Sequence, residues 1–264
     1  MKDLIILKIG GSVVTDKFSE TPKANLSNIK RISKEISCAY KENKMPLIVI
    51  HGAGSYGHVI VKKTDIDKGI KKESQLKDFA ETQRLQNELN CIFTKYLIEE
   101  GVPAFPCQAS ASAVMKAGKL SYMDISMIAG MLKIGIVPVL YGVPAYDEVQ
   151  KCSILSGDEI APYLAVKLKA KKIIHATNVD GVFTSDPKNN KNAKLIPEIN
   201  SKNIDQVKKL LTGSTATDVT GGMFKKVSEL IGVGVESQLV NALTSGNVLK
   251  ALNGDKVLGT IIRL

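Results

Sequence analysis

The chain has 264 residues, of which 44% are apolar and 23% charged, and its formal net charge at pH 7 is +10. These fractions are ordinary for a soluble globular protein, and the length can bury the core of one large α/β domain or two small ones. No apolar run reaches the roughly 20 residues that a membrane-spanning helix needs. The strand-like run Leu4-Ile5-Ile6-Leu7 lacks the features of a signal peptide, so we expect a cytoplasmic protein with no membrane partner.

The positive charge is spread along the whole chain and interleaved with Asp and Glu. The densest lysine clusters have no aromatic neighbours for base stacking, so we expect a solvated surface and no nucleic-acid partner. The positive electrostatic field of this surface would still attract nucleotides and other small polyanions. The cysteines are scattered and form no Cys-x-x-Cys pair, which argues against a zinc site and favours thiols in a reducing compartment: Cys38, Cys91, Cys107 and Cys152.

Strand-like apolar runs alternate with helical stretches from end to end. We expect strands at residues 4–9, 47–51, 104–107, 136–141, 172–176, 237–241 and 259–263. Helices are expected at 25–43, 74–100, 125–133, 158–168, 203–211, 223–232 and 247–252. The alternation predicts one domain over residues 1–264, an α/β three-layer αβα sandwich with a central, mostly parallel sheet. Ligands of such folds bind at the carboxyl ends of the strands.

The loop His51-Gly52-Ala53-Gly54-Ser55-Tyr56-Gly57-His58 follows one of these strands. Its glycines permit a sharp turn and a close approach to a ligand, and a helix that starts after them would favour an anion. The spacing Gly52-x-Gly54-x-x-Gly57 also matches a dinucleotide fingerprint, but no acidic residue ends a following strand about 20 residues on. His58 is suited to a phosphomonoester, whose second pKa of about 6 is close to that of histidine.

Two further charged residues lie at the ends of expected elements: Lys8 near the end of a strand and Asp158 at the start of a helix. Lys8 closes an apolar strand, and it is either a strand-end lysine that reaches solvent or a cation aimed at a phosphoryl group. Asp158 follows Ser156-Gly157 at the start of a helix, and it is either an N-cap or an anchor for lysine ammonium groups. We interpret His51 and His175 as structural. The chain has no P-loop pattern and no protein-kinase motif set.

Five motifs stand out along the chain: Lys8-x-Gly10-Gly11-Ser12, His51-Gly52-Ala53-Gly54, Ser156-Gly157-Asp158, Val179-Asp180-Gly181-Val182-Phe183-Thr184-x-Asp186-Pro187 and Asp218-Val219-Thr220-Gly221-Gly222-Met223-x-x-Lys226. Together these motifs resemble the amino acid kinase superfamily over essentially the whole chain. Within the superfamily, His58 after Gly57, with Thr15-Asp16-Lys17 after the first glycine loop, is similar to the archaeal-type isopentenyl phosphate kinases of an alternative mevalonate pathway.

The resemblance implies transfer of the ATP γ-phosphoryl group to isopentenyl phosphate, which gives isopentenyl diphosphate in isoprenoid biosynthesis. Magnesium would bridge the ATP phosphates with no direct protein carboxylate, and the protein would be a homodimer. The acceptor would bind within roughly residues 1–150 and the nucleotide within roughly 151–264. The implied catalytic residues are Lys8, Lys17, His58, Asp158 and Lys226. The implied acceptor-binding residues are Gly10, Gly11, Gly52, Ala53, Gly54, Gly57, His58 and Gly157. The implied nucleotide-binding residues are Lys8, Gly10, Ser12, Lys17, Thr177, Asp180, Gly181, Gly222 and Lys226.

Two positions depart from the family pattern. Val143 stands where the family commonly has Asp after Tyr-Gly, and Asn178 stands where it commonly has Asp after Thr. Each departure removes a negative charge near the expected site. Two alternatives remain: another small-molecule kinase of the superfamily, such as a fosfomycin-type kinase, and a non-catalytic nucleotide-binding sensor. The retained lysines argue against the sensor, because a pure binder needs no charge aimed at a transition state.

Overall fold

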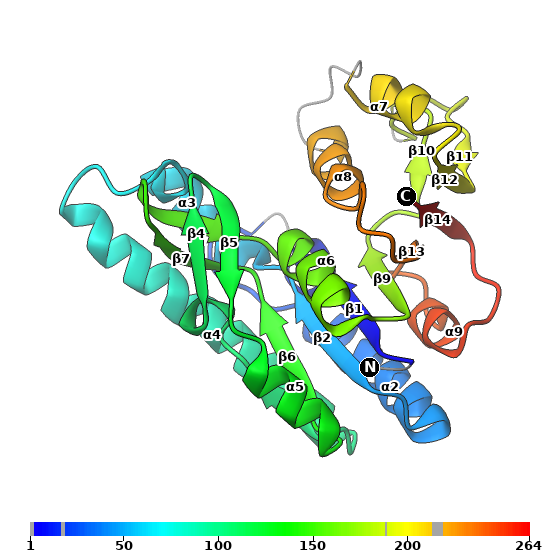
Figure 1. The fold of residues 1–264 in the computed structure, drawn as a ribbon, viewed down its shortest axis with the longest axis horizontal. Coiled ribbons are helices and arrows are strands. Elements are labelled where there is room, and N and C mark those ends of the chain that lie inside the picture. The colour runs from blue at the N-terminus through cyan, green and yellow to red at the C-terminus, as the bar shows by residue number, and fades with distance from the viewer. Residues whose placement is uncertain (1–2, 17–18, 188, 213–218) are drawn as a thin grey trace.

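A central eight-stranded sheet runs through the protein (Figure 1). The computed structural model describes residues 3–16, 19–187, 189–212 and 219–264. All neighbouring strands of this sheet are parallel except β13 and β14. Its order is β12 (Glu198–Asn200), β14 (Gly259–Arg263), β13 (Ser237–Asn241), β9 (Lys172–Thr177), β1 (Ile5–Ile9), β2 (Leu47–His51), β6 (Val137–Tyr141) and β3 (Ala104–Pro106).

Helices cover both faces of this sheet and enclose two cores, so the expected three-layer arrangement is confirmed. One core is closed by α1 (Gly11–Val14), α2 (Leu26–Asn43), α4 (Ser74–Glu99) and α9 (Asn247–Asn253). The other is closed by α5 (Ser126–Lys133), α6 (Gly157–Leu168), α7 (Ile204–Thr212) and α8 (Val219–Ser228). The short helix α3 (His58–Thr64) and the 3₁₀ turns η1 (Gly54–Tyr56), η2 (Ile66–Lys68) and η3 (Ala109–Ala111) complete the helices of the described residues.

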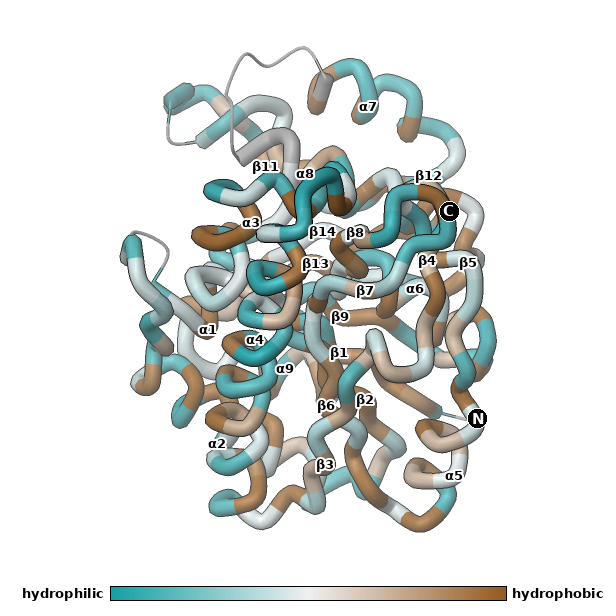
Figure 2. The backbone as a smooth tube through the Cα atoms, turned by 90° about the vertical axis from the view of Figure 1, so that its left-hand side faces the viewer, coloured by the Kyte–Doolittle hydropathy of each residue, from teal (hydrophilic) through white to brown (hydrophobic). Residues whose placement is uncertain are grey.

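Strand β1 is buried along its whole length, because it lies between the two cores (Figure 2). Successive side chains of a strand point to opposite faces. Ile6 belongs to the core under α5 to α8, whereas Leu7 and Ile9 belong to the core under α2, α4 and α9. The alternation therefore places Lys8 on the same face as Ile6, beneath α6.

The structure contains a second sheet that the sequence did not predict. It has the order β5 (Lys119–Met123), β4 (Ala113–Lys116), β7 (Val143–Asp147) and β8 (Lys151–Leu155), and a further pair joins β10 (Val182–Phe183) to β11 (Leu195–Ile196). These strands are short, and β5 is largely exposed, so its apolar pattern is weak. The strands and helices that the sequence predicts are all present, with boundaries shifted by at most a few residues. None of the helices in the described ranges is both long and apolar enough to cross a bilayer.

Asp147 joins the two hairpins of the second sheet. Its buried carboxylate accepts hydrogen bonds from the N–H groups of Gly118 and Gln150 and from the hydroxyl of Ser153, as well as from two more N–H groups, those of Ala117 and Val149. Burial alone would raise the pKa of Asp147, but the bonds from Ser153 and Gly118 hold it well below its ordinary value. The carboxylate therefore stays ionised, and four of its five hydrogen-bond donors are backbone N–H groups with fixed positions.

Candidate active site

Three charged side chains meet at the carboxyl edge of the central sheet. The Lys8 ammonium lies 2.7 Å from Asp158 Oδ1, and the Lys226 ammonium lies 3.2 Å from Oδ1 and 3.0 Å from Oδ2 of the same carboxylate. Lys8 is the next-to-last residue of β1, Asp158 lies in the first turn of α6, and Lys226 lies on α8. Asp158 thus holds two cations, and the interpretation of Lys8 as a strand-end lysine that reaches solvent is wrong, because Lys8 is only 5% exposed.

The start of α6 fixes Asp158 in this place. Ser156 is the N-cap, and its N–H and hydroxyl groups donate to the Glu159 carboxylate in a capping box. Asp158 is therefore not the N-cap. The alternative in which it anchors lysine ammonium groups agrees with the geometry. Gly157, just before it, has no room for a side chain without crowding Ile50 and the Lys8 stem.

The cluster carries one net positive charge in a buried position. Burial lowers the pKa of Lys8 to about 8, although the neighbouring Asp158 carboxylate acts in the opposite direction. Burial would raise the pKa of Asp158, but Lys8 and Lys226 bring it well below its ordinary value. An additional anion beside the two ammonium groups would thus be stabilised at neutral pH. A phosphoryl group in transfer is such an anion.

His175 belongs to the same cluster, which the sequence did not indicate. It is directly paired with Lys8 across β1 and β9, and its Nδ1 lies 3.7 Å from Asp158 Oδ1. Burial lowers the pKa of His175, so its ring is neutral at pH 7. No sequence signal could find this contact, because it depends on the register of two strands that are distant in the chain.

The two glycine loops pack directly against each other. A side chain on Gly11 would collide with the backbone of Gly54, and one on Gly52 would collide with the backbone of Gly11. Gly54 has φ +51° and lies against Thr15, whose hydroxyl oxygen accepts from the N–H of Ser55. Thr15 therefore links the loops, a role that the sequence analysis missed. Glycine is required here for backbone contact between loops as well as for any approach to a ligand.

Part of the expected anion cradle needs correction. The N–H of Gly10 donates to Ala176 O at 2.8 Å, and the N–H of Gly52 donates to Ile9 O at 2.9 Å. These two groups continue the hydrogen-bond ladder of the sheet and do not point at a phosphate. Gly11, Ser12, Ala53 and Gly54 remain the candidates for backbone contacts to phosphate. Gly52 is needed for the close packing of the loops, whereas a side chain on Gly10 would meet only ordinary contacts.

His58 is the exposed first residue of α3. As expected, a helix follows the glycine loop, because α3 begins directly after Gly57. It has only seven residues, however, and the 3₁₀ turn η1 lies within the loop before it. The contribution of a helix dipole at this loop is accordingly small. Gly57 packs against Ala53 and the buried Gln86 side chain of α4, which fixes the loop just before His58. Lys17 lies outside the described residues.

The expected nucleotide segment forms a tight turn after β9. The Thr177 hydroxyl donates to Val179 O, and the Asp180 carboxylate accepts from the Asn241 side chain. Gly181, with φ +146°, leaves room for Thr260 on β14. These contacts shape the turn and keep Asp180 in a fixed orientation. Of the two departures from the family pattern, Val143 is fully buried in the core beneath α6, where a carboxylate would be costly, and Asn178 is partly buried in this turn.

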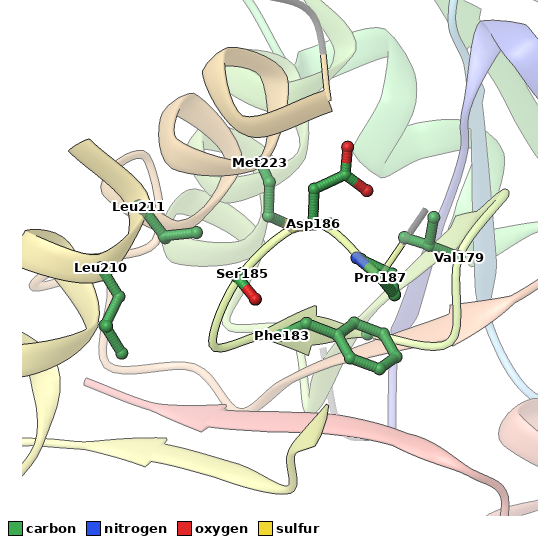
Figure 3. Close-up of a pocket in the computed structure, with 9 residues that line it drawn as sticks. Val179, Phe183, Ser185, Asp186, Pro187, Leu210, Leu211 and Met223 are labelled. Carbon is green, nitrogen blue, oxygen red and sulfur yellow. The ribbon is translucent and has the colours of Figure 1, made fainter. Parts of the chain in front are cut away.

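A mostly apolar pocket opens beside this turn (Figure 3). Met223 contributes to it from α8 and lies three residues, or about 4.5 Å of helix rise, before Lys226. The exposed Gly222 precedes Met223 on the same helix. Of the residues that line the pocket, Gly181 was expected to bind the nucleotide, whereas Val179, Phe183, Asp186, Pro187 and Met223 entered only as parts of the family motifs. The pocket is lined by Val179, Gly181, Phe183, Ser185, Asp186, Pro187, Leu210, Leu211 and Met223.

Within the part of the chain that the structure describes, no group of three or more His, Cys, Asp or Glu side chains is arranged to hold a metal ion. Asp158, the carboxylate at the centre of the cluster, already contacts two ammonium groups.

Comparisons with known proteins agree with this geometry. The model of the amino acid kinase family matches residues 3–237. The chain is 40% identical to the isopentenyl phosphate kinase of Methanothermobacter thermautotrophicus and 38% identical to that of Methanocaldococcus jannaschii, with 98% of both chains covered in each comparison. A solved isopentenyl phosphate kinase superposes with a TM-score of 0.84 at 37% identity, over 98% of this chain and 99% of the other. The chain therefore belongs to the amino acid kinase family and, within it, to the isopentenyl phosphate kinases.

Proposed function

We propose that this protein transfers the γ-phosphoryl group of ATP to isopentenyl phosphate, which yields isopentenyl diphosphate and ADP. The observation that carries the proposal is the pair of ammonium groups, from Lys8 and Lys226, that Asp158 holds at the carboxyl edge of the sheet. Relatives that are 40% and 38% identical over 98% of their length are isopentenyl phosphate kinases, which supports the choice of acceptor.

In this reaction an oxygen of the acceptor phosphate attacks the γ-phosphorus while the bond to the ADP oxygen breaks. Charge develops on the γ-phosphoryl oxygens, and Lys8 and Lys226 stabilise it, joined by Lys17 as the family resemblance implies. A phosphate dianion is already a nucleophile, so no strong general base is needed. It needs a donor that fixes its geometry, and we assign this role to His58.

The nucleotide would extend from the apolar pocket to the charged cluster along α8. Met223 lines the pocket and Lys226 contacts Asp158, so a base in the pocket would direct its phosphates toward Lys8. Apolar walls such as Phe183 suit the faces of an adenine ring. We therefore propose that residues 151–264 bind the nucleotide and residues 1–150 bind the acceptor. The two parts meet where β9 pairs with β1.

We further propose that Mg²⁺ enters with ATP, where it would supply additional neutralisation of the phosphate charge. The charged cluster is consistent with this proposal, because both oxygens of its carboxylate, Asp158, already accept hydrogen bonds from lysine. The described residues thus bind the nucleotide phosphates rather than the ion itself.

The functional unit is proposed to be a cytoplasmic homodimer. Exposed apolar side chains occur around the edge strand β3, with Phe105 on the strand, Ile98 near the end of α4 and Ile134 after α5. An edge strand with apolar neighbours favours pairing with a second copy. Light scattering on the purified protein tests this directly, and Ile134→Lys should shift the mass toward the monomer.

The proposed reaction is tested by ADP release with Mg–ATP across a panel of acceptors, with ³¹P NMR to identify the product. The panel contains isopentenyl phosphate, dimethylallyl phosphate, fosfomycin, UMP, glutamate and carbamate. We expect fast turnover confined to the prenyl phosphates and a new diphosphate signal. Activity on another acceptor alone would assign a different kinase reaction, and silence on the whole panel would favour the sensor.

A further inference from the structure

His175 is a buried titratable side chain that the proposed reaction leaves without a role. It is fully enclosed, and neither ring nitrogen has a hydrogen-bond partner. Buried polar nitrogens without partners are uncommon and costly, since an unmet donor loses about 1–3 kcal/mol. In the row across the sheet, His175 lies between Lys8 on β1 and the apolar Leu239 on β13.

The acceptor that would satisfy His175 is already occupied. Asp158 Oδ1 lies 3.7 Å from His175 Nδ1, which is beyond hydrogen-bond range. The same oxygen contacts Lys8 at 2.7 Å and Lys226 at 3.2 Å. A carboxylate oxygen has two lone pairs, so two ammonium donors saturate it. A third donor can bind only when one of the lysines turns away.

We propose that His175 is a positioning residue that donates its Nδ1–H to Asp158 when the lysines engage ATP phosphates. This inference rests on the proposed function, because it requires Lys8 and Lys226 to contact the nucleotide. Phosphate oxygens compete with Asp158 for the ammonium protons, so a lysine that turns toward them leaves a lone pair of Oδ1 open. His175 then moves by less than 1 Å to close the hydrogen bond, and Asp158 keeps its orientation.

The charge on His175 matters for this role. The charged groups that face it are Lys8 from β1, Asp158 from α6 and Lys226 from α8, while β13 contributes the apolar Leu239. A neutral imidazole donates one hydrogen bond without competing with the lysines as a third cation. Burial keeps the ring neutral, since it lowers the pKa of His175 below its ordinary value.

The decisive experiment is ¹⁵N NMR of the imidazole groups in the wild-type protein, which has only three histidines. The β,γ-imido analogue of ATP with Mg²⁺ serves as the probe, and its binding is confirmed by calorimetry. We expect His175 to carry its proton on Nδ1 at pH 7 and this proton to shift downfield when the analogue binds. His51, which is equally buried but lies on the opposite face of the sheet, is the internal control. A proton on Nε2, or no shift with the analogue bound, would overturn the proposal.

Two isosteric variants provide a kinetic test. Asparagine places its amide nitrogen near the position of Nδ1, whereas glutamine reaches only the position of Nε2. His175→Asn should keep kcat within about threefold of the wild type, and H175Q should lower it about tenfold, as expected for one hydrogen bond to a charged group. Equal losses in both variants would contradict the assignment. If neither variant folds, the wild-type spectrum still decides. If isopentenyl phosphate is not turned over, the proposed function fails, but the spectrum still tests His175.

Discussion

Asp147 is buried and Asp158 is partly buried, and the pKa values of both lie below the ordinary value, yet their partners differ in kind. Asp147 accepts from four backbone N–H groups and one hydroxyl, which are fixed by the hairpins they belong to. Asp158 accepts from two lysine ammonium groups on long side chains. Fixed donors make Asp147 a structural anchor. Mobile charged donors can be shared with a ligand, so Asp158 is suited to catalysis.

The largest effect is expected for Lys8→Met, which keeps the length of the side chain but removes its charge. A cation on the transferring phosphoryl group is worth about 10³-fold or more in rate, so kcat should fall by about 10³-fold. The affinity for Mg–ATP, measured by calorimetry, should change far less. A loss confined to ATP affinity would mean that Lys8 binds the ground state and the transition state equally.

Asp158→Asn should lower kcat by about 10²-fold, because the two ammonium groups lose the anion that orients them. It also leaves the buried ammonium group of Lys8 and the partly buried one of Lys226 without an anionic partner. The variant should therefore gain more thermal stability from Mg–ATP than the wild type does. Thermal unfolding with and without nucleotide measures this gain, and an equal gain in both proteins would argue that the cations do not meet the phosphates.

His58→Ala should reduce kcat/KM for isopentenyl phosphate by about 10²-fold, since it removes a charge-assisted hydrogen bond to the acceptor. The KM for ATP should stay near the wild-type value. His58→Asn, which keeps a donor, is the matched control and should retain part of the activity. If alanine leaves kcat/KM unchanged for the acceptor, the role of His58 must be abandoned.

Asp147→Asn tests whether Asp147 contributes to stability rather than to catalysis. The amide loses the charge that five donors stabilise, so the free energy of unfolding should fall by about 3 kcal/mol. The kcat of the folded fraction should remain within about threefold of the wild type. Urea unfolding and steady-state kinetics on the same sample measure both quantities. A large loss of kcat with unchanged stability would reverse the roles of the two aspartates.

The smallest effect is the pH dependence that Lys8 imposes. Its pKa is about 8, so kcat/KM for ATP should fall toward tenfold per pH unit above that value. Between pH 8 and the ordinary pKa of 10.5, the unfolded chain binds more protons at this residue than the folded chain. The contribution of Lys8 to the free energy of unfolding therefore rises with pH while activity declines. A profile that stays flat to pH 9.5 would refute the lowered pKa.

Much of the fold and of the charged cluster is predictable from the sequence. The strand that carries Lys8 near its end and the helix that begins near Asp158 are local patterns, and parallel strands bring their carboxyl ends to one edge. His175 is different, because only the register between β1 and β9 places it beside Lys8. The apolar pocket also depends on long-range packing, since Phe183 and Met223 come from separate elements. The partner of the Gly52 N–H, the carbonyl oxygen of Ile9, likewise follows from tertiary structure.

The central claim, that Asp158 acts through the lysines it holds, is tested most directly by a double-mutant cycle in kcat. The four proteins are the wild type, Lys8→Met, Asp158→Asn and the double variant, each assayed with saturating Mg–ATP and isopentenyl phosphate. If Asp158 works by orienting Lys8 and Lys226, the loss in the double variant falls well short of the product of the two single losses. A loss equal to that product would show that Asp158 and Lys8 act independently, and the account of the cluster would be wrong.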